Sequence, residues 1–330
     1  MPVPLSVLDQ SPIAHGATPR AAVEATISLA KRAEELGYRR YWLAEHHAIP
    51  SLADASPEIL LARLTGETSR IRLGTGGIML PHYSAFKVAE VFRMLHALAP
   101  DRIDLGVGRA PGGTRMVSAA LRSQDSDLFP EQIADVLSYF RGDRTDPRLR
   151  GLVAQPAGET SPAMWVLGSS DFGARLAAEL GLPYSFAQFI GGDYPEVTHG
   201  YRQLFEPSAY LDKPHVMVTI AAIVAATDEE ADLLSLPALL HRMRRLRGIL
   251  APHPSLEEAR AYPWSEREKA ETIASRNMII GSPATVRTRI DELVERYAAD
   301  EVMVVTIAPD YPTRMRSYEL LAEACSPAAA

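Results

Sequence analysis

The stretch LGTGGIMLPHYSAFKVAEVFRMLHALAPDRIDLGVGRAPGG, from Leu73 to Gly113, indicates the fold most clearly. It predicts a short apolar strand, a helix over Ala85–Leu98 and a second short strand over Ile103–Val107. The first strand runs into two adjacent glycines, and the second is followed by Gly and Arg. Buried strands usually avoid glycine, so we interpret both strand ends as places where the backbone closely approaches a ligand.

The same alternation of strand and helix continues along the rest of the chain. We predict eight strands: Pro4–Asp9, Arg40–Ala44, Ile71–Leu80, Ile103–Val107, Ala163–Gly168, Pro183–Ala187, Val216–Ala225 and Glu301–Ile307. The predicted helices are Ala21–Leu36, Pro57–Thr68, Ala85–Leu98, Pro130–Arg141, Phe172–Leu180, Tyr194–Phe205, Glu229–Arg247, Pro283–Tyr297 and Arg314–Ala324. Eight such units without a second sheet favour a closed (β/α)8 TIM barrel over an open doubly wound sheet.

Two segments are too long for simple connections within this repeat. We expect residues 142–162 to form a surface excursion and residues 248–281 to cover the barrel mouth as a lid, with a charged helix over Ser265–Ser275. A decorative insertion is an equally good interpretation of the second segment. With no linker to divide the chain, we expect residues 1–330 to form a single domain.

Composition and charge exclude several classes of protein. The 330 residues are 47% hydrophobic and 23% charged, which is typical of a soluble globular protein. A formal net charge of −7 argues against a nucleic-acid-binding groove. The longest apolar run, Val216–Ala226, is too short to cross a bilayer, and the N-terminal residues do not resemble a signal peptide. A single cysteine, Cys325, excludes an intrachain disulfide, so we expect a cytoplasmic protein without membrane or nucleic-acid partners.

Side chains at the carboxyl ends of barrel strands face the active-site mouth. Glu45, His46 and His47 follow the second strand, and carboxylate with imidazole can bind a metal, act as acid and base, or serve structure alone. Adjacent strand residues face opposite sides, so only one of the two histidines can easily face the pocket. We therefore favour a pocket acid or base, and predict no metal ion.

Phosphate binding is predicted after the fifth strand. Gly168, Ser169 and Ser170 precede the helix Phe172–Leu180, and a helix N-terminus with small residues binds phosphate readily. An ordinary helix cap is the competing interpretation. Arg109, after the fourth strand, can supply a planar counter-charge.

The glycine-rich segments do not form a dinucleotide-binding motif, because neither Gly74–Gly77 nor Gly106–Gly108 opens a helix with the required spacing. Flat backbone at Gly76 and Gly77 instead suits a flat ligand, although glycines in strands also mark simple bulges. A phosphate site, a flat backbone face, one histidine and one arginine at a barrel mouth fit flavin mononucleotide (FMN).

At this point the sequence resembles the bacterial luciferase-like monooxygenase superfamily. The resemblance rests on GTGGIMLPHYSAFKVAEVFRMLHALAPDRIDLGVGRAPG, which ends in the family's Gly-x-x-Arg-Gly-like block, on WLAEHH, on LGSSDFGARLAAELGLPYSFA, and on GSPATVRTRIDELVERYAADEVMVVT near the end. The resemblance implies a (β/α)8 barrel that binds FMN or a deazaflavin.

The resemblance also implies roles for individual residues. His46 matches the histidine beside the reactive part of the isoalloxazine, and Gly76–Gly77 matches a non-proline cis peptide packed against the ring. Arg109, Ser170 and the N–H of Gly173 match groups that hold the phosphate. We place Glu45 and Gln188 in the substrate pocket. Gly108 and Gln188 replace a cysteine and a tryptophan of the light-emitting chain, so light emission from a long-chain aldehyde is not expected.

The leading hypothesis is a monooxygenase that takes reduced FMN from a separate flavin reductase, adds O₂ and oxygenates a small organic substrate. A second hypothesis is hydride transfer between a deazaflavin and an alcohol or imine. A third is a flavin-binding protein without turnover. The resemblance further implies a homodimer formed through the second and third barrel helices.

Overall fold

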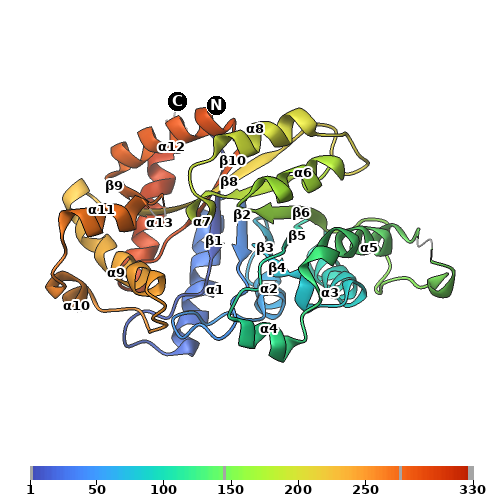
Figure 1. Ribbon diagram of the computed structural model, residues 1–330, viewed down its shortest axis with the longest axis horizontal. Helices are drawn as coiled ribbons and strands as arrows, with labels where there is room; N and C mark the ends of the chain where they lie inside the picture. Colours follow the sequence, from blue (N-terminus) through green and yellow to red (C-terminus); the bar gives the residue numbers. More distant parts are fainter. Residues whose placement is uncertain (1–2, 144–145, 275–276, 326–330) are drawn as a thin grey trace.

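A computed structural model describes residues 3–143, 146–274 and 277–325. Its strands are all parallel (Figure 1): β1 (Leu5–Asp9), β2 (Arg40–Leu43), β3 (Arg72–Thr75), β4 (Ile78–Met79), β5 (Ile103–Gly108), β6 (Ala163–Gly168), β7 (Tyr184–Ala187), β8 (Val216–Val224), β9 (Ile279–Gly281) and β10 (Glu301–Val305). The order β1-β2-β3-β5-β6-β7-β8 continues to β10, which pairs with both β8 and β1. Because this closes the ring, the predicted TIM barrel is confirmed.

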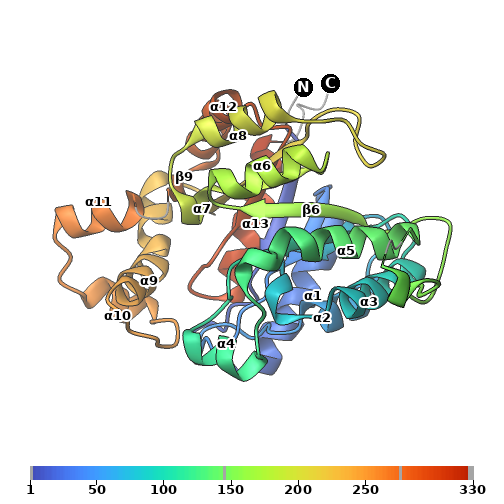
Figure 2. The ribbon, with the colours of Figure 1, turned by 45° about the vertical axis from the view of Figure 1, so that its right-hand side comes forward.

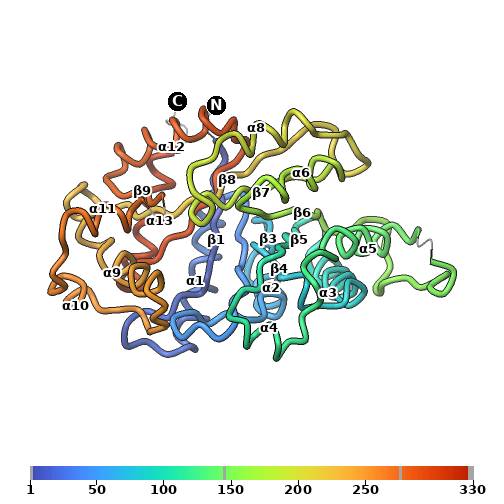
Figure 3. Tube along the Cα trace, viewed as in Figure 1, coloured from blue at the N-terminus to red at the C-terminus, as the bar shows by residue number. Residues whose placement is uncertain are grey.

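Helices surround the ring of strands, as the trace in Figure 3 shows. They are α1 (Pro19–Glu35), α2 (Pro57–Thr65), α3 (Ala85–Leu98), α4 (Arg115–Leu121), α5 (Phe129–Arg141), α6 (Asp171–Glu179), α7 (Gln188–Gly191), α8 (Pro195–Leu204), α9 (Asp228–Leu246), α10 (Leu256–Ala261), α11 (Glu266–Ala274), α12 (Pro283–Tyr297) and α13 (Tyr311–Cys325). None of the described helices combines the length and the apolar character that a membrane crossing requires.

Several elements differ from the sequence-based expectation. The predicted strand Ile71–Leu80 is divided into β3 and β4 at Gly76–Gly77, because a cis peptide bond joins these two glycines. The short helices α4, α7 and α10 were not predicted, since fewer than eight residues leave little periodic signal. Strand β9 was also missed, because it is only three residues long and pairs with the end of β8 outside the ring.

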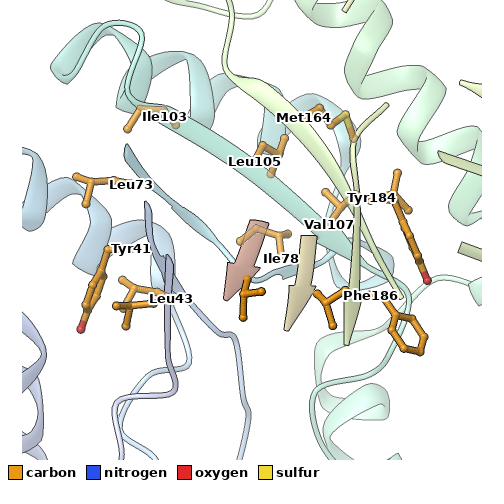
Figure 4. Close-up of a cluster of buried hydrophobic side chains, with 14 of the residues drawn as sticks. Tyr41, Leu43, Leu73, Ile78, Ile103, Leu105, Val107, Met164, Tyr184 and Phe186 are labelled. Carbon is orange, nitrogen blue, oxygen red and sulfur yellow. The ribbon is translucent and has the colours of Figure 1, made fainter. Parts of the chain in front are cut away.

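Strand residues alternate between two apolar clusters. Tyr41, Leu43, Ile103, Leu105 and Val107 belong to the large cluster between the strands and the helices (Figure 4). The residues between them in the chain face the other way. Leu8, Trp42, Trp165, Met217 and Met303 form a separate cluster inside the barrel. The barrel is therefore filled by side chains and does not form an open pore.

Charged side chains fill the barrel interior at the amino ends of the strands. Arg40 donates to Asp104 at 2.8 Å and to Glu301 at 2.9 Å, and all three side chains are almost completely buried. Asp104 also accepts a hydrogen bond at 3.0 Å from Nε1 of Trp42. This charged layer closes the amino end, so open space within the barrel lies toward the carboxyl ends.

The two long segments lie on different sides of the molecule (Figure 2). Residues 142–162 join the end of α5 to the start of β6, which places them at the amino end of the barrel, where Arg93 donates to the carbonyls of Gly158 and Thr160. Residues 248–281 contain α10, α11 and β9. The predicted helix Ser265–Ser275 corresponds to α11, with Ser275 outside the described residues. Closure of this segment as a lid stays a prediction.

Candidate functional site

A cavity of about 670 Å³ opens at the carboxyl ends of the barrel strands. Its floor is apolar and includes Leu8, Trp42 and Met303 from the interior cluster. All residues predicted to bind the cofactor line this one cavity, namely Gly76, Gly77, Arg109, Gly168, Ser169, Ser170 and Gly173. The volume is within the range of cofactor and substrate sites. The structure therefore brings together residues from three separate strand ends.

Gly76 and Gly77 form one wall of the cavity, and the cis peptide bond implied by the family resemblance is present between them. A Cβ atom on Gly76 would lie 2.6 Å from Cδ1 of Leu8, and one on Gly77 would lie 2.7 Å from the carbonyl oxygen of Gly106. Glycine is thus required at Gly77, where the backbone of a neighbouring strand approaches closely, whereas the nearest atom at Gly76 is the end of a flexible side chain. Close strand packing is therefore a reason for glycine at Gly77 besides the proposed approach of a ligand.

The turn from β6 into α6 forms the opposite end of the site. Gly168 and Gly173 pack closely, since a Cβ on either would lie 3.5 Å from the Cα of the other. Ser170 is the N-cap of α6, and its side chain makes no capping hydrogen bond. The first N–H groups of this nine-residue helix are therefore not capped by that hydroxyl and are available to an anion. Asp171 in the first turn opposes an anion, but its exposed carboxylate lies 3.4 Å from Arg175.

Arg109 supplies positive charge at the same end. Its guanidinium carbon lies 4.1 Å from the ring centroid of Phe172, the second residue of α6, and both side chains line the cavity. Among the described residues no carboxylate forms an ion pair with Arg109. Stacking on the Phe172 ring orients the planar guanidinium group, and its N–H groups stay available as hydrogen-bond donors. Such an arrangement is suited to binding a phosphate.

Glu45 does not line the cavity. Its side chain is fully buried. The carboxylate accepts hydrogen bonds from the N–H of Met79 at 2.9 Å and from the hydroxyl of Tyr83 at 2.8 Å. It also lies 2.7 Å from Nε2 of His47. These contacts give no support to a place for Glu45 in the substrate pocket, which stays a prediction. Trp42 and Ala44 face the barrel interior, and alternation turns Glu45 to the other side.

Gln188 lies in a second cavity of about 290 Å³, together with residues of α11 and α12. The sequence argument treated Gln188 as a strand-end residue facing the mouth. The chain instead turns into α7 directly after β7, and Phe189 and Ile190 line the main cavity in its place. A role of Gln188 in the substrate pocket therefore stays a prediction.

Trp42 and Ala44 face the barrel interior, and continued alternation would point His46 to the same side. His47 instead bonds to Glu45 on the other side. Neither histidine is among the residues that line the cavity, so the expectation that one of them faces the pocket stays a prediction. The side chain of His46 is half-buried and is not among those that line the cavity. Its catalytic role stays a prediction.

One group of side chains has the composition of a metal site. Ligand atoms of Glu45, His47 and His82 lie within 4.8 Å of one another. However, His82 already has Ser123 Oγ at 2.6 Å from Nδ1 and the carbonyl oxygen of Pro111 at 2.8 Å from Nε2. Because these atoms are engaged, the group joins β2 to the loop after β5 through hydrogen bonds.

Sequence reasoning missed several cavity residues. Ser185 and Thr219 face the cavity from the middle of β7 and β8, and strict alternation along the predicted strands could have identified them. Ser126, Asp127 and Phe129 reach the cavity from the segment between α4 and α5. No periodic signal marks that segment, so only the tertiary structure reveals it.

A family model described as "Luciferase-like monooxygenase" matches residues 3–300 of this chain. The chain belongs to the luciferase-like monooxygenase family. It is 37% identical over 324 residues to a protein of Escherichia coli (strain K12) named "Luciferase-like monooxygenase", which covers 96% of both chains. It is 36% identical over 330 residues to the "N-acetyl-S-alkylcysteine monooxygenase" of Bacillus subtilis (strain 168), which covers 97% of both chains.

Solved structures agree with this assignment. The crystal structure of apo-MsnO8 has a TM-score of 0.92 and 39% identity, and the match covers 98% of this chain and 99% of that one. At lower identity the fold alone is shared with two cofactor-dependent enzymes. The oxygenating constituent of a 3,6-diketocamphane monooxygenase of Pseudomonas putida, in complex with FMN, has a TM-score of 0.73, 18% identity and coverage of 99% of both chains. An F420-dependent secondary alcohol dehydrogenase has a TM-score of 0.68, 14% identity and coverage of 99% and 100%.

Asp54 places a buried carboxyl group behind the histidine segment of this luciferase-like protein. The carbonyl of Asp54 accepts the N–H of His46 at 3.2 Å, and its carboxyl group is 5% exposed. Burial raises the pKa of Asp54 to about 7, although a hydrogen bond from the Ser56 N–H opposes the shift. The folded protein therefore favours the protonated form.

We predict that Asp54→Asn changes the dependence of stability on pH. The pKa of Asp54 in the folded protein lies above its value of 3.8 in the unfolded chain. The wild type therefore loses stability as pH rises from about 4 to about 7, and this loss persists at higher pH. At about pH 8 the free energy of unfolding of the variant should exceed that of the wild type by on the order of 2 kcal/mol. Near pH 4 the two free energies should be equal. Urea denaturation across this range measures the difference. Asp212→Asn, at an exposed position, is the control, and equal stability of Asp54→Asn and wild type at about pH 8 would contradict the prediction.

Proposed function

We propose that this protein is a cytoplasmic flavin-dependent monooxygenase that receives reduced FMN from a separate flavin reductase and uses O₂ to oxygenate a small organic substrate. The supporting observation is a single cavity with two unlike ends. One end has a helix N-terminus whose N-cap side chain makes no capping bond, with Arg109 beside it. The other has apolar walls and close-packed glycine backbone. This pattern matches a ligand with a phosphate and a large flat ring.

The residues present fit FMN. The first N–H groups of α6, Ser170 and Arg109 would hold the phosphate, and the backbone of Gly76 and Gly77 would face the ring. When bound and reduced, the flavin supplies the reaction with O₂. The apolar floor formed by Leu8, Trp42 and Met303 keeps water from the deep end of the site.

We propose that His46 exchanges a proton with the reacting groups at the mouth. It lies directly beyond the interior-facing residues Trp42 and Ala44, and its backbone N–H is held by Asp54. Histidine is suited to this role because its unperturbed pKa lies near neutral pH. His46→Asn should slow turnover and leave FMN affinity unchanged, since no part of the phosphate site depends on this side chain.

The substrate is proposed to be a small molecule with an apolar part. Met79, Phe129, Phe189 and Ile190 line the cavity and offer contact area to such a group. The name of the Bacillus subtilis relative describes a thioether substrate, and sulfur is a soft atom that is readily oxygenated. A thioether is therefore a reasonable first compound in a substrate screen.

The proposal predicts a change in how reduced FMN reacts with oxygen. Protein and anaerobically reduced FMN are mixed rapidly with oxygenated buffer, and absorbance is followed with time. We expect an absorbing species different from both reduced and oxidised FMN to precede the oxidised form, because the enclosed site delays decay to water. Oxidation at the rate of free reduced FMN would contradict the proposal. Preferred binding of a deazaflavin would instead favour hydride transfer, the reaction class of the F420-dependent structural relative.

A second prediction concerns the phosphate. Arg109→Ala should raise the dissociation constant for FMN by roughly 10-fold to 100-fold, because it removes a charge-assisted contact, and should leave that for riboflavin unchanged. Fluorescence titration with both ligands measures the two constants. Arg115→Ala, an exposed cation on nearby α4 that does not line the cavity, is the control. An equal loss of FMN and riboflavin affinity would remove Arg109 from the phosphate site.

We also propose that two copies of the chain associate through α2 and α3. Ile59 on α2 and Met94 and Leu98 on α3 are more than half exposed, and they border one surface hollow. Large apolar side chains that gather on a surface usually mark an interface. Met94→Asp should therefore yield monomers in light scattering. The Met116→Asp variant, at a more exposed methionine on α4, should keep the wild-type mass, and a monomeric wild type would overturn the proposal.

A further inference from the structure

Two hydroxyl groups lie deep in the cavity and have no role in the site described so far. Ser185 on β7 and Thr219 on β8 line the cavity, and their residues are only 2% and 3% exposed. Their side-chain oxygens lie 3.2 Å apart and form a hydrogen bond in which either can be the donor. The other side-chain hydroxyls and charges that line the cavity belong to the phosphate end or to the Ser126–Asp127 segment at the mouth.

The position of this hydroxyl pair follows from the order of the strands. Around the ring, β8 is four strands from β3 in either direction, so it lies across the barrel from the strand that leads into Gly76–Gly77. Alternation places Thr219 on the interior side of β8 with Met217 and Ala221, and Ser185 on the interior side of β7 with Ala187. The hydroxyl pair and the glycine wall therefore face the same cavity from opposite sides.

Counting hydrogens shows that one of them lacks an acceptor. Each hydroxyl has one hydrogen, and the bond between Ser185 and Thr219 uses one of the two. No further side-chain partner of either hydroxyl is found among the described residues. The interior neighbours Ala187, Met217 and Ala221 are apolar and accept no strong hydrogen bond. The second hydrogen can therefore bond only to something within the cavity.

We propose that the Ser185–Thr219 hydroxyl pair donates a hydrogen bond to the polar edge of the bound flavin ring and so fixes the ring within the barrel. This inference rests on the proposed function. The pyrimidine edge of a flavin has carbonyl oxygens and ring nitrogens, and burying these without partners is costly. With the phosphate at the α6 terminus, the ring extends toward the deep part of the cavity, where these two are the most buried hydroxyl groups that line it among the described residues. The other buried side-chain donor there, Nε1 of Trp42, already bonds to Asp104.

The decisive variant removes both hydroxyls while keeping the shape of the site. The double variant Ser185→Ala/Thr219→Val is used because either hydroxyl alone can still donate to the ligand. Ser11 and Thr26 provide a matched control, since their hydroxyls also form a fully buried pair, at 3.1 Å, and neither residue lines the cavity. The control variant is Ser11→Ala/Thr26→Val. Thermal unfolding of all variants checks that each remains folded.

Two properties are measured with oxidised FMN as the probe: its dissociation constant and the visible absorption spectrum of the bound flavin. We expect the double variant to bind FMN about five- to tenfold more weakly and to shift the flavin absorption bands, because a hydrogen bond to the ring is lost. The control variant should match the wild type in both properties.

Unchanged affinity and an unchanged spectrum in the folded double variant would overturn the inference. A loss of affinity without a band shift would also overturn it, because that result indicates a change of cavity shape alone. If the wild type binds deazaflavin and not FMN, the proposed function fails, and the same variants are titrated with the deazaflavin, which has the same pyrimidine carbonyls. A weaker, band-shifted complex then supports the role of the hydroxyl pair. A wild type that binds neither cofactor overturns both.

Discussion

The buried charged layer at the amino end of the barrel is the constraint on which the rest of the structure depends. Asp104 accepts hydrogen bonds from Arg40, Arg72 and Trp42, and Glu301 shares Arg40. Burial alone would raise the pKa of Glu301, but His215, whose Nε2 lies 3.5 Å from the carboxylate, and the charge of Arg40 lower it to about 2. Buried charges are tolerated only when paired in this way, so removing one member would leave the others uncompensated.

This layer determines where a ligand can bind. Trp42 is held by Asp104 and packs edge-on against Trp165 at a centroid distance of 5.2 Å, which closes the barrel interior above the charges. The strands then approach so closely at Gly77 and Gly106 that a side chain at either glycine would collide with the backbone of the neighbouring strand. The main cavity lies at the carboxyl ends of the strands. The way in which the barrel is filled therefore explains the position and the apolar floor of the cavity.

The site combines parts that differ in how firmly they are fixed. Interior residues such as Thr219 belong to barrel strands and are held by the ladder of backbone hydrogen bonds. The β6–α6 turn is fixed by close glycine packing and by Tyr184, whose hydroxyl bonds to the carbonyl of Ser170 at 3.1 Å. The segment around Ser126 and Asp127 is exposed and depends on few contacts. We therefore expect the family's shared cofactor chemistry to depend on the strands and the β6–α6 turn, and substrate choice to depend on the exposed segment.

The sequence by itself determined the barrel and most element positions, because hydrophobic periodicity and helix-start signals are local properties of the chain. The meeting of Arg109 with Gly168 and Gly173 in one cavity was also predictable, since carboxyl ends of parallel strands always meet at one face. Phosphate binding by these residues stays a prediction. Only the tertiary structure decided the places of Glu45 and Gln188. Glu45 is held by hydrogen bonds from other elements, including that from Tyr83, and Gln188 lies where the chain turns into α7, and local sequence patterns reveal neither arrangement.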